Sequence, residues 1–189
     1  HLISDKGVGG GMFGEGGGPG EAARSVEDAR TFRAPKLCVT EQRLPEVPAG
    51  VESLRFLEEL DLSGNRLSAI PPGSVPPTLH GVTLTGNSLE ELPEAVLRLP
   101  ALQRLNCGAN RLSSCDAMFT CGSLLHAGLS YNKISELHVP EGHPLMSLDL
   151  ANNHLEDLDQ TLSELEKLPR LAALSLQGNP FCLRKDYRD

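Results

Sequence analysis

Histidine and cysteine side chains are the groups of this sequence that could ligate a metal ion or act as nucleophiles, and the chain holds six histidines and five cysteines. Zinc sites need these residues in close pairs, such as two cysteines separated by two to four positions. The cysteines are odd in number and show neither such a pair nor a Cys/His spacing suited to zinc: Cys38, Cys107, Cys115, Cys121 and Cys182. We therefore expect free thiols in a reducing compartment, with no bound metal and no cofactor.

A glycine-rich run from Gly7 to Gly20 contains the spacing G-x-G-x-x-G at Gly9, Gly11 and Gly14. In dinucleotide-binding proteins this motif follows an apolar strand and opens a helix, because its backbone amides must face the pyrophosphate. Neither flank is present here, so the run predicts a flexible linker. No Ser/His/Asp order and no pair of carboxylates stands out elsewhere, and we expect no enzymatic activity.

The elements that position the remaining polar residues follow from a repeat. The pattern L-x-x-L-x-L-x-x-N-x-L recurs with its asparagines at steps of 22, 23, 22, 21 and 26 residues, and a degenerate first copy fits residues 37–47. Six copies in one register are the signature of leucine-rich repeats. The asparagines are Asn65, Asn87, Asn110, Asn132, Asn153 and Asn179.

This spacing predicts an α/β solenoid of about six to seven repeats. The period of two in L-x-L indicates a short strand with leucines facing inward, so the strands should form a concave parallel sheet. Each asparagine should bond backbone groups at the turn that follows. We expect irregular turns on the convex side, with short helices within residues 157–170 and 93–98, where apolar residues recur at helical spacing.

The repeat also assigns places to the histidines and cysteines. His80 and His126 project from strands two repeats apart, about 10 Å at the usual strand spacing, which is too far to share a metal ion. Cys107 and Cys115 occupy leucine positions and should lie in the core, whereas Cys38 should be exposed. Three more histidines should lie on the surface, in or beside the turns: His138, His143 and His154.

Two regions are expected along the chain. Residues 1–33 should form the glycine-rich flexible N-terminal segment, within which residues 21–33 predict a short helix leading into the repeats. Residues 34–189 should form the repeat domain, with a C-terminal cap from about residue 177, because Pro180 turns the chain away from another repeat. Phe181 and Leu183 should cover the end of the core, while the residues after them face water and Tyr187 lays its ring on the core.

The concave face is the candidate binding surface, since solenoids usually bind partners there. Register places three acidic residues, Glu58, Glu59 and Asp61, at its N-terminal end. It places an apolar trio, Leu125, Tyr131 and Met146, toward its C-terminal half. This arrangement predicts a protein-binding face that selects a basic segment. The alternative is a solvated face with incidental apolar residues. The candidate residues are Glu58, Glu59, Asp61, His80, Gln103, Arg104, Leu125, His126, Tyr131, Met146 and Asp149.

Composition narrows the class of molecule that the chain could bind. A formal charge of -8 argues against binding to nucleic acid or anionic lipid, and favours a protein partner. No apolar stretch approaches the roughly 20 residues of a membrane-spanning helix, and the first residues lack the apolar core of a signal peptide. We therefore expect a cytoplasmic protein. The chain begins with His1 rather than Met, which is compatible with a fragment of a longer protein.

The repeats resemble the intracellular leucine-rich repeats of about 22 residues, as in phosphatase-regulating and dynein-light-chain members. Three stretches are similar to a narrower group of axonemal and cytoskeletal leucine-rich repeat proteins: VPPTLHGVTLTGNSLEEL, LMSLDLANNHLEDL and LPRLAALSLQGNPFCLRKDYRD. This resemblance implies a non-enzymatic scaffold of the motile-cilium axoneme with axonemal or cytoskeletal protein partners. A regulatory or targeting subunit of a soluble enzyme such as a protein phosphatase is the alternative.

Overall fold

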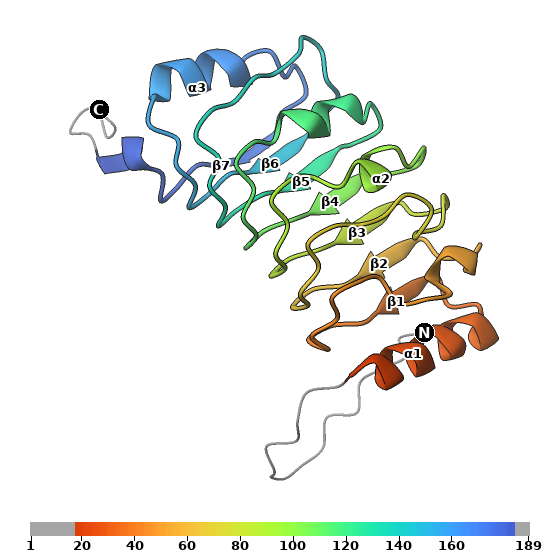
Figure 1. Cartoon of the computed structure of the whole chain (residues 1–189). Helices are drawn as coiled ribbons and strands as arrows, with labels where there is room; N and C mark the ends of the chain where they lie inside the picture. Colours follow the sequence, from red (N-terminus) through yellow and green to blue (C-terminus); the bar gives the residue numbers. More distant parts are fainter. Residues whose placement is uncertain (1–17, 184–189) are drawn as a thin grey trace.

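Seven short strands stack in chain order into one parallel sheet in the computed structural model, which describes residues 18–183 (Figure 1). Each strand pairs with the next without a shift in register, so that Leu37, Leu60 and Val82 are direct partners of their neighbours. The predicted solenoid with a parallel sheet is therefore confirmed. The strands are β1 (Lys36–Cys38), β2 (Glu59–Asp61), β3 (Gly81–Thr83), β4 (Arg104–Asn106), β5 (His126–Gly128), β6 (Ser147–Asp149) and β7 (Ala173–Ser175).

The hydrophobic core runs behind the sheet along the whole stack. The middle residue of each strand from β1 to β6 points inward and is buried, as are the leucines three positions before it and two positions after it in the inner repeats. Alternation along a strand sends its first and third residues to the opposite, concave face. The inward row therefore fixes which side chains a partner can reach.

A ladder of buried asparagines joins the turns that follow the strands. The Asn132 amide donates to Cys107 O of the preceding repeat at 3.0 Å and to Leu129 O of its own repeat at 3.0 Å. Its oxygen accepts from Leu112 N at 3.0 Å. The predicted role of the asparagines is confirmed, because these bonds satisfy backbone groups that the bend leaves unpaired.

The residue before each asparagine, and before Gln42 in the first repeat, has a positive φ, because the chain must turn sharply there. Glycine occupies this position in three repeats and adopts such angles without steric cost. Four other repeats place a residue with a Cβ there, at φ values between 50° and 58°. The residues of this row are Glu41, Gly64, Gly86, Ala109, Tyr131, Asn152 and Gly178.

Short helical segments connect the strands on the convex side. The two predicted convex helices are confirmed as α2 (Glu94–Leu97) and α3 (Leu158–Leu165). Asp157 caps α3 by accepting a hydrogen bond from Gln160 N at 3.0 Å, as an aspartate at a helix N-terminus commonly does. The 3-10 helices are η1 (Val51–Ser53), η2 (Asp116–Thr120) and η3 (Pro180–Leu183). Among the described residues, no helix is long and apolar enough to cross a membrane.

Helix α1 (Pro19–Phe32) lies at the β1 end of the stack, where it covers the first repeat (Figure 1). Ala22, Val26 and Ala29 are buried in the same core as the repeats. The helix predicted for residues 21–33 is confirmed and begins two residues earlier. The folded core thus extends in front of residue 34. Residues 7–17 of the predicted linker lie outside the described residues.

The β7 end of the stack is less covered among the described residues. Phe181 is buried, as predicted. Leu183 is 89% exposed, so the prediction that it covers the core is wrong. Residues two positions apart in a 3-10 helix point in different directions, and η3 can therefore turn only one of these two side chains to the core. The predicted cap residues from Arg184 to Arg188, with Tyr187, lie outside the described residues.

Candidate protein-binding surface

Two rows of side chains project from the concave face, one from the first and one from the third residue of every strand. The parallel register aligns them across the sheet, as the sequence predicted. From β2 to β7 the first row is Glu59, Gly81, Arg104, His126, Ser147 and Ala173, and the second is Asp61, Thr83, Asn106, Gly128, Asp149 and Ser175.

A shallow groove of about 400 Å³ lies on this face between β2 and β6. Two glycines, Gly81 and Gly128, form parts of its floor, and no side chain rises from either of them. The groove brings together four of the predicted site residues. These four are Glu59, Arg104, His126 and Asp149, and Asn106 lines the groove beside them.

Glu59 and Arg104 form an ion pair that crosses the intervening strand β3. The glycine between them makes this possible, because a Cβ added to Gly81 would lie 2.8 Å from Glu59 Cδ. Both side chains remain partly exposed. The pair therefore neutralises one positive and one negative charge at the N-terminal side of the groove.

Asp61 and Asp149 end their strands with the same local turn. Asp61 Oδ1 accepts from Ser63 N at 2.9 Å, and Asp149 Oδ1 accepts from Ala151 N at 3.0 Å. Asn106 makes the equivalent bond to Gly108 N at 3.0 Å. One oxygen of each side chain thus holds the turn. The remaining carboxylate oxygen of Asp149 has no hydrogen-bond or ion-pair partner among residues 18–183.

A third row lies at the edge where the strands begin. Its residues are linked through their backbones: His80 N donates to Glu58 O, Gln103 N to His80 O, and Leu125 N to Gln103 O. Met146 continues the row, with its N–H 2.8 Å from Leu125 O. The predicted apolar residues Leu125 and Met146 are therefore neighbours. Glu58 and Met146 are exposed, while the other three are half-buried.

Tyr131 does not join this apolar pair. It lies in the turn after β5, whereas Leu125 precedes β5, so the strand separates the two side chains. The residue is 64% exposed, and its N–H donates to Ala151 O at 2.9 Å. The structure thus places the predicted trio at two opposite edges of the concave sheet.

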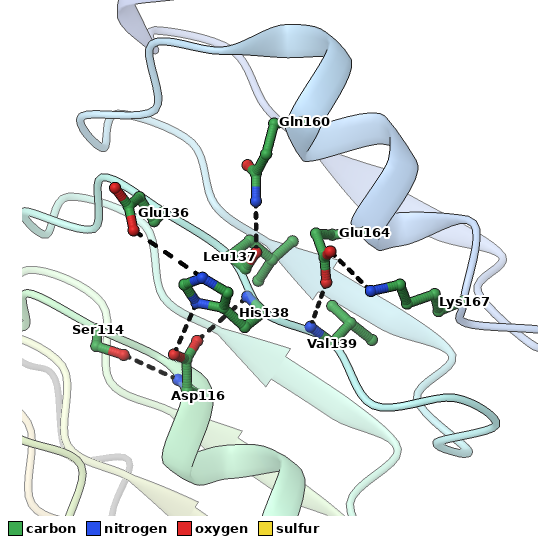
Figure 2. Close-up of polar contacts among 9 residues, drawn as sticks. All are labelled: Ser114, Asp116, Glu136, Leu137, His138, Val139, Gln160, Glu164 and Lys167. Atoms are coloured by element: carbon green, nitrogen blue, oxygen red, sulfur yellow. Dashed lines mark hydrogen bonds and ion pairs between the residues drawn. The ribbon is translucent and has the colours of Figure 1, made fainter.

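A polar cluster on the convex side joins three successive repeats (Figure 2). His138 Nδ1 lies 3.0 Å from Asp116 Oδ2, and His138 Nε2 lies 4.0 Å from Glu136. Glu164 of α3 accepts from Val139 N at 2.7 Å and pairs with Lys167 at 2.7 Å. The Lys167 hydrogen bond, followed by that from Val139, lowers the pKa of Glu164.

The spacing of Asp116 and His138 in the sequence could have predicted their contact. Asp116 and His138 are 22 residues apart, which is one repeat, and equivalent positions of adjacent repeats lie side by side in a solenoid. The groups drawn in Figure 2 bond to one another, so they serve to join the repeats. Asp149 differs from these groups, because its second carboxylate oxygen has no hydrogen-bond or ion-pair partner within the described part of the chain.

His143 is buried, so its predicted surface position is wrong. Its Nε2 lies 3.1 Å from Cys121 O, and its ring meets Phe119 edge-on at 5.2 Å. Burial lowers its pKa. The aromatic contact and the bond to Cys121 O explain why the core accepts an imidazole at this position.

The five cysteines are free thiols. Cys107 and Cys115 lie in the core as predicted, and burial raises the pKa of each to about 12. Cys38 is exposed as predicted, although partial desolvation raises its pKa as well. These shifts favour the thiol over the reactive thiolate. Within residues 18–183, no three His, Cys, Asp or Glu side chains are placed to hold a metal ion together.

Comparison with known proteins supports the repeat assignment. A family model described as Leucine Rich Repeat matches residues 56–77. Human leucine-rich repeat-containing protein 43 is 34% identical over 71% of this chain and 19% of its own length. The mouse protein of the same name is 36% identical over 71% of this chain and 18% of its own length. The chain thus spans about a fifth of the length of these curated relatives.

A solved structure shares the fold. A leucine-rich repeat protein of Leptospira interrogans superposes with a TM-score of 0.66 at 33% sequence identity, over 76% of this chain and 37% of the other. Strand order, inward leucines and the asparagine ladder agree with these similarities. The chain belongs to the leucine-rich repeat family and is related to leucine-rich repeat-containing protein 43.

Proposed function

We propose that this chain is a non-enzymatic adaptor that binds another protein through its concave face. The observation that carries the proposal is the groove of about 400 Å³, which is floored by Gly81 and Gly128. The missing side chains keep the floor of the groove low, and the polar groups of Glu59 and Asn106 lie over these two glycines, where a partner can meet them. The family supports the same function, because leucine-rich repeats generally mediate protein–protein contacts.

The apolar pair Leu125 and Met146 is the proposed anchor at the edge where the strands begin. Met146 is 40% exposed, and the Leu125 side chain beside it is half-buried. Apolar side chains that a partner covers contribute about 25 cal/mol for each Å² removed from water. Tyr131, at the opposite edge, is a separate proposed contact that a partner reaches only by crossing the sheet.

Replacing Leu125 and Met146 together with aspartate tests this face. The partner is first identified by cross-linking mass spectrometry on isolated cilia, and its binding to the purified variant is then measured. We expect the double variant to lose binding, because buried carboxylates oppose the contact. The matched control is L162D, since Leu162 is 43% exposed on the convex helix α3. Unchanged binding by the double variant would move the interface away from the concave face.

The place of action that we propose is the axoneme of motile cilia, where the protein would serve as a structural adaptor. The proposal rests on the resemblance to axonemal leucine-rich repeat proteins and on the relation to leucine-rich repeat-containing protein 43. A structural adaptor should remain with axonemes after a high-salt wash. A protein that washes out and co-purifies with phosphatase activity would instead be a regulatory subunit of a soluble enzyme.

A further inference from the structure

Only some of the charged residues in the concave groove form ion pairs. Glu59 and Arg104 neutralise each other at its N-terminal side. Asp149, at its C-terminal side, forms no ion pair among the described residues. The strands that carry Arg104 and Asp149, β4 and β6, are about 10 Å apart at the usual strand spacing. The uncompensated negative charge of the groove therefore belongs to Asp149.

Two side chains with hydrogen-bond acceptors, Asn106 and Asp149, belong to the register partners of Gly128 on either side. An added Cβ at Gly128 would lie 2.9 Å from Asn106 Oδ1, so the Asn106 amide leans over this glycine from β4. Asp149 is its register partner on the other side, in β6. Each side chain uses one hydrogen bond to hold its own turn and retains further accepting capacity. A group with several donors and a positive charge matches this arrangement.

We propose that the groove binds an arginine side chain of an extended segment of the partner protein, with the guanidinium between Asn106 and Asp149. A guanidinium offers five N–H donors in one plane and can bond both acceptors at once. This inference rests on the proposed function and adds the chemistry of the partner. It also moves the selecting charge from the acidic corner at Glu58, Glu59 and Asp61 to the other end of the groove.

Asp61 provides a matched control for Asp149. It occupies the same row and accepts the same turn bond, at 2.9 Å against 3.0 Å. It does not line the groove, and its register partner is Thr83, which carries a side chain where Asp149 faces Gly128. Asparagine can replace either residue without loss of the turn, because Asn106 makes this bond naturally.

Fluorescence anisotropy with three pools of labelled octapeptides tests the inference. The pools carry arginine, glutamine or glutamate at one fixed position and random uncharged residues elsewhere. We expect the arginine pool to bind tightest, and D149N to weaken its binding about tenfold, a typical loss for one charge-assisted bond. D61N should bind like the unmodified chain. E59Q should weaken binding of the arginine pool, because it releases the positive charge of Arg104 into the groove.

Several results would overturn the inference. They are an arginine pool that binds no tighter than the glutamine pool, equal losses in D149N and D61N, and no binding of any pool to the folded protein. If the arginine and glutamine pools bind equally and L125D with M146D abolishes both, the concave face still binds protein and only the arginine assignment fails. D149N could weaken binding of the arginine pool while the L125D/M146D variant binds the axonemal partner as tightly as the unmodified chain. In that case the proposed function fails and the arginine assignment stands.

Discussion

The His143 ring fills a space between convex turns, with Nε2 bonded to Cys121 O and Nδ1 buried without a partner among the described residues. A neutral imidazole suits this environment better than an imidazolium, because an ion there would lose its hydration. Burial accordingly holds the pKa of His143 below its ordinary value of 6.5. The unfolded chain takes up this proton more readily than the folded one, which links the stability of the fold to pH.

We expect the free energy of unfolding to fall as pH drops from 7.5 to 5.5. The lowered pKa makes the stabilisation complete above the ordinary histidine value, and protonation of the unfolded chain removes it below that value. H143Q should reduce this pH dependence, since glutamine can bond Cys121 O but does not titrate. Urea titrations at both pH values measure the effect. H154Q, at an exposed histidine, is the control, and an H143Q slope equal to that of the control would contradict the assignment.

The asparagine ladder shows why one polar residue per repeat is kept inside an apolar stack. Asn110 and Asn132 each bond carbonyls of two successive repeats and accept an N–H from the earlier one. In the first repeat Gln42 occupies this position, and its side-chain oxygen is buried without a partner in the described structure. The longer side chain places its amide differently. The degenerate first copy in the sequence thus corresponds to a physically poorer turn.

The residue before each asparagine lies in a sharp turn with a positive φ. Gly86 has a φ of 67°, and a Cβ added there would make only ordinary contacts, 3.6 Å from Gly64 N. Ala109 occupies the same position one repeat later with a φ of 50°. Both positions therefore require a left-handed backbone, which glycine adopts more easily than alanine.

We expect G86A to lower the free energy of unfolding by about 1 to 2 kcal/mol, because it forces a Cβ into the left-handed region. A109G should raise it slightly, by about 0.5 kcal/mol, since relief of strain exceeds the added entropy of the unfolded chain. Equilibrium urea unfolding of both variants provides the comparison. Effects of the same sign would show that packing, and not φ, controls this turn.

Strand register was predictable because a shift of one residue would turn every leucine to the concave face. The rows of the candidate surface follow from the same register, although their binding stays a prediction. The Glu59–Arg104 pair was not predictable, since the two residues lie 45 positions apart and meet only because Gly81 leaves the space between them open. The burial of His143 was hidden for a similar reason, because its contacts come from the preceding convex turn.

On the scale of the whole molecule, each repeat contacts mainly its neighbours, so the two ends are the places where burial is incomplete. Leu174 of β7 is 43% exposed, whereas its equivalent Leu148 in β6 is buried. At the other end Leu37 of β1 is buried, because α1 lies against that strand. The pattern of leucines is the same at both ends, and so it could not predict which end would be covered.

Helix α1 should therefore stabilise the first repeats. We expect removal of residues 1–34 to lower the free energy of unfolding by about 3 kcal/mol, given one buried valine and two buried alanines. Removal of residues 1–17 is the control and should change little. Hydrogen exchange should speed up at Val39 and Leu44, near the exposed end, and stay slow at Leu129, four repeats farther on. Equal stability of the two truncated chains would mean that the repeats hold their N-terminal end without the helix.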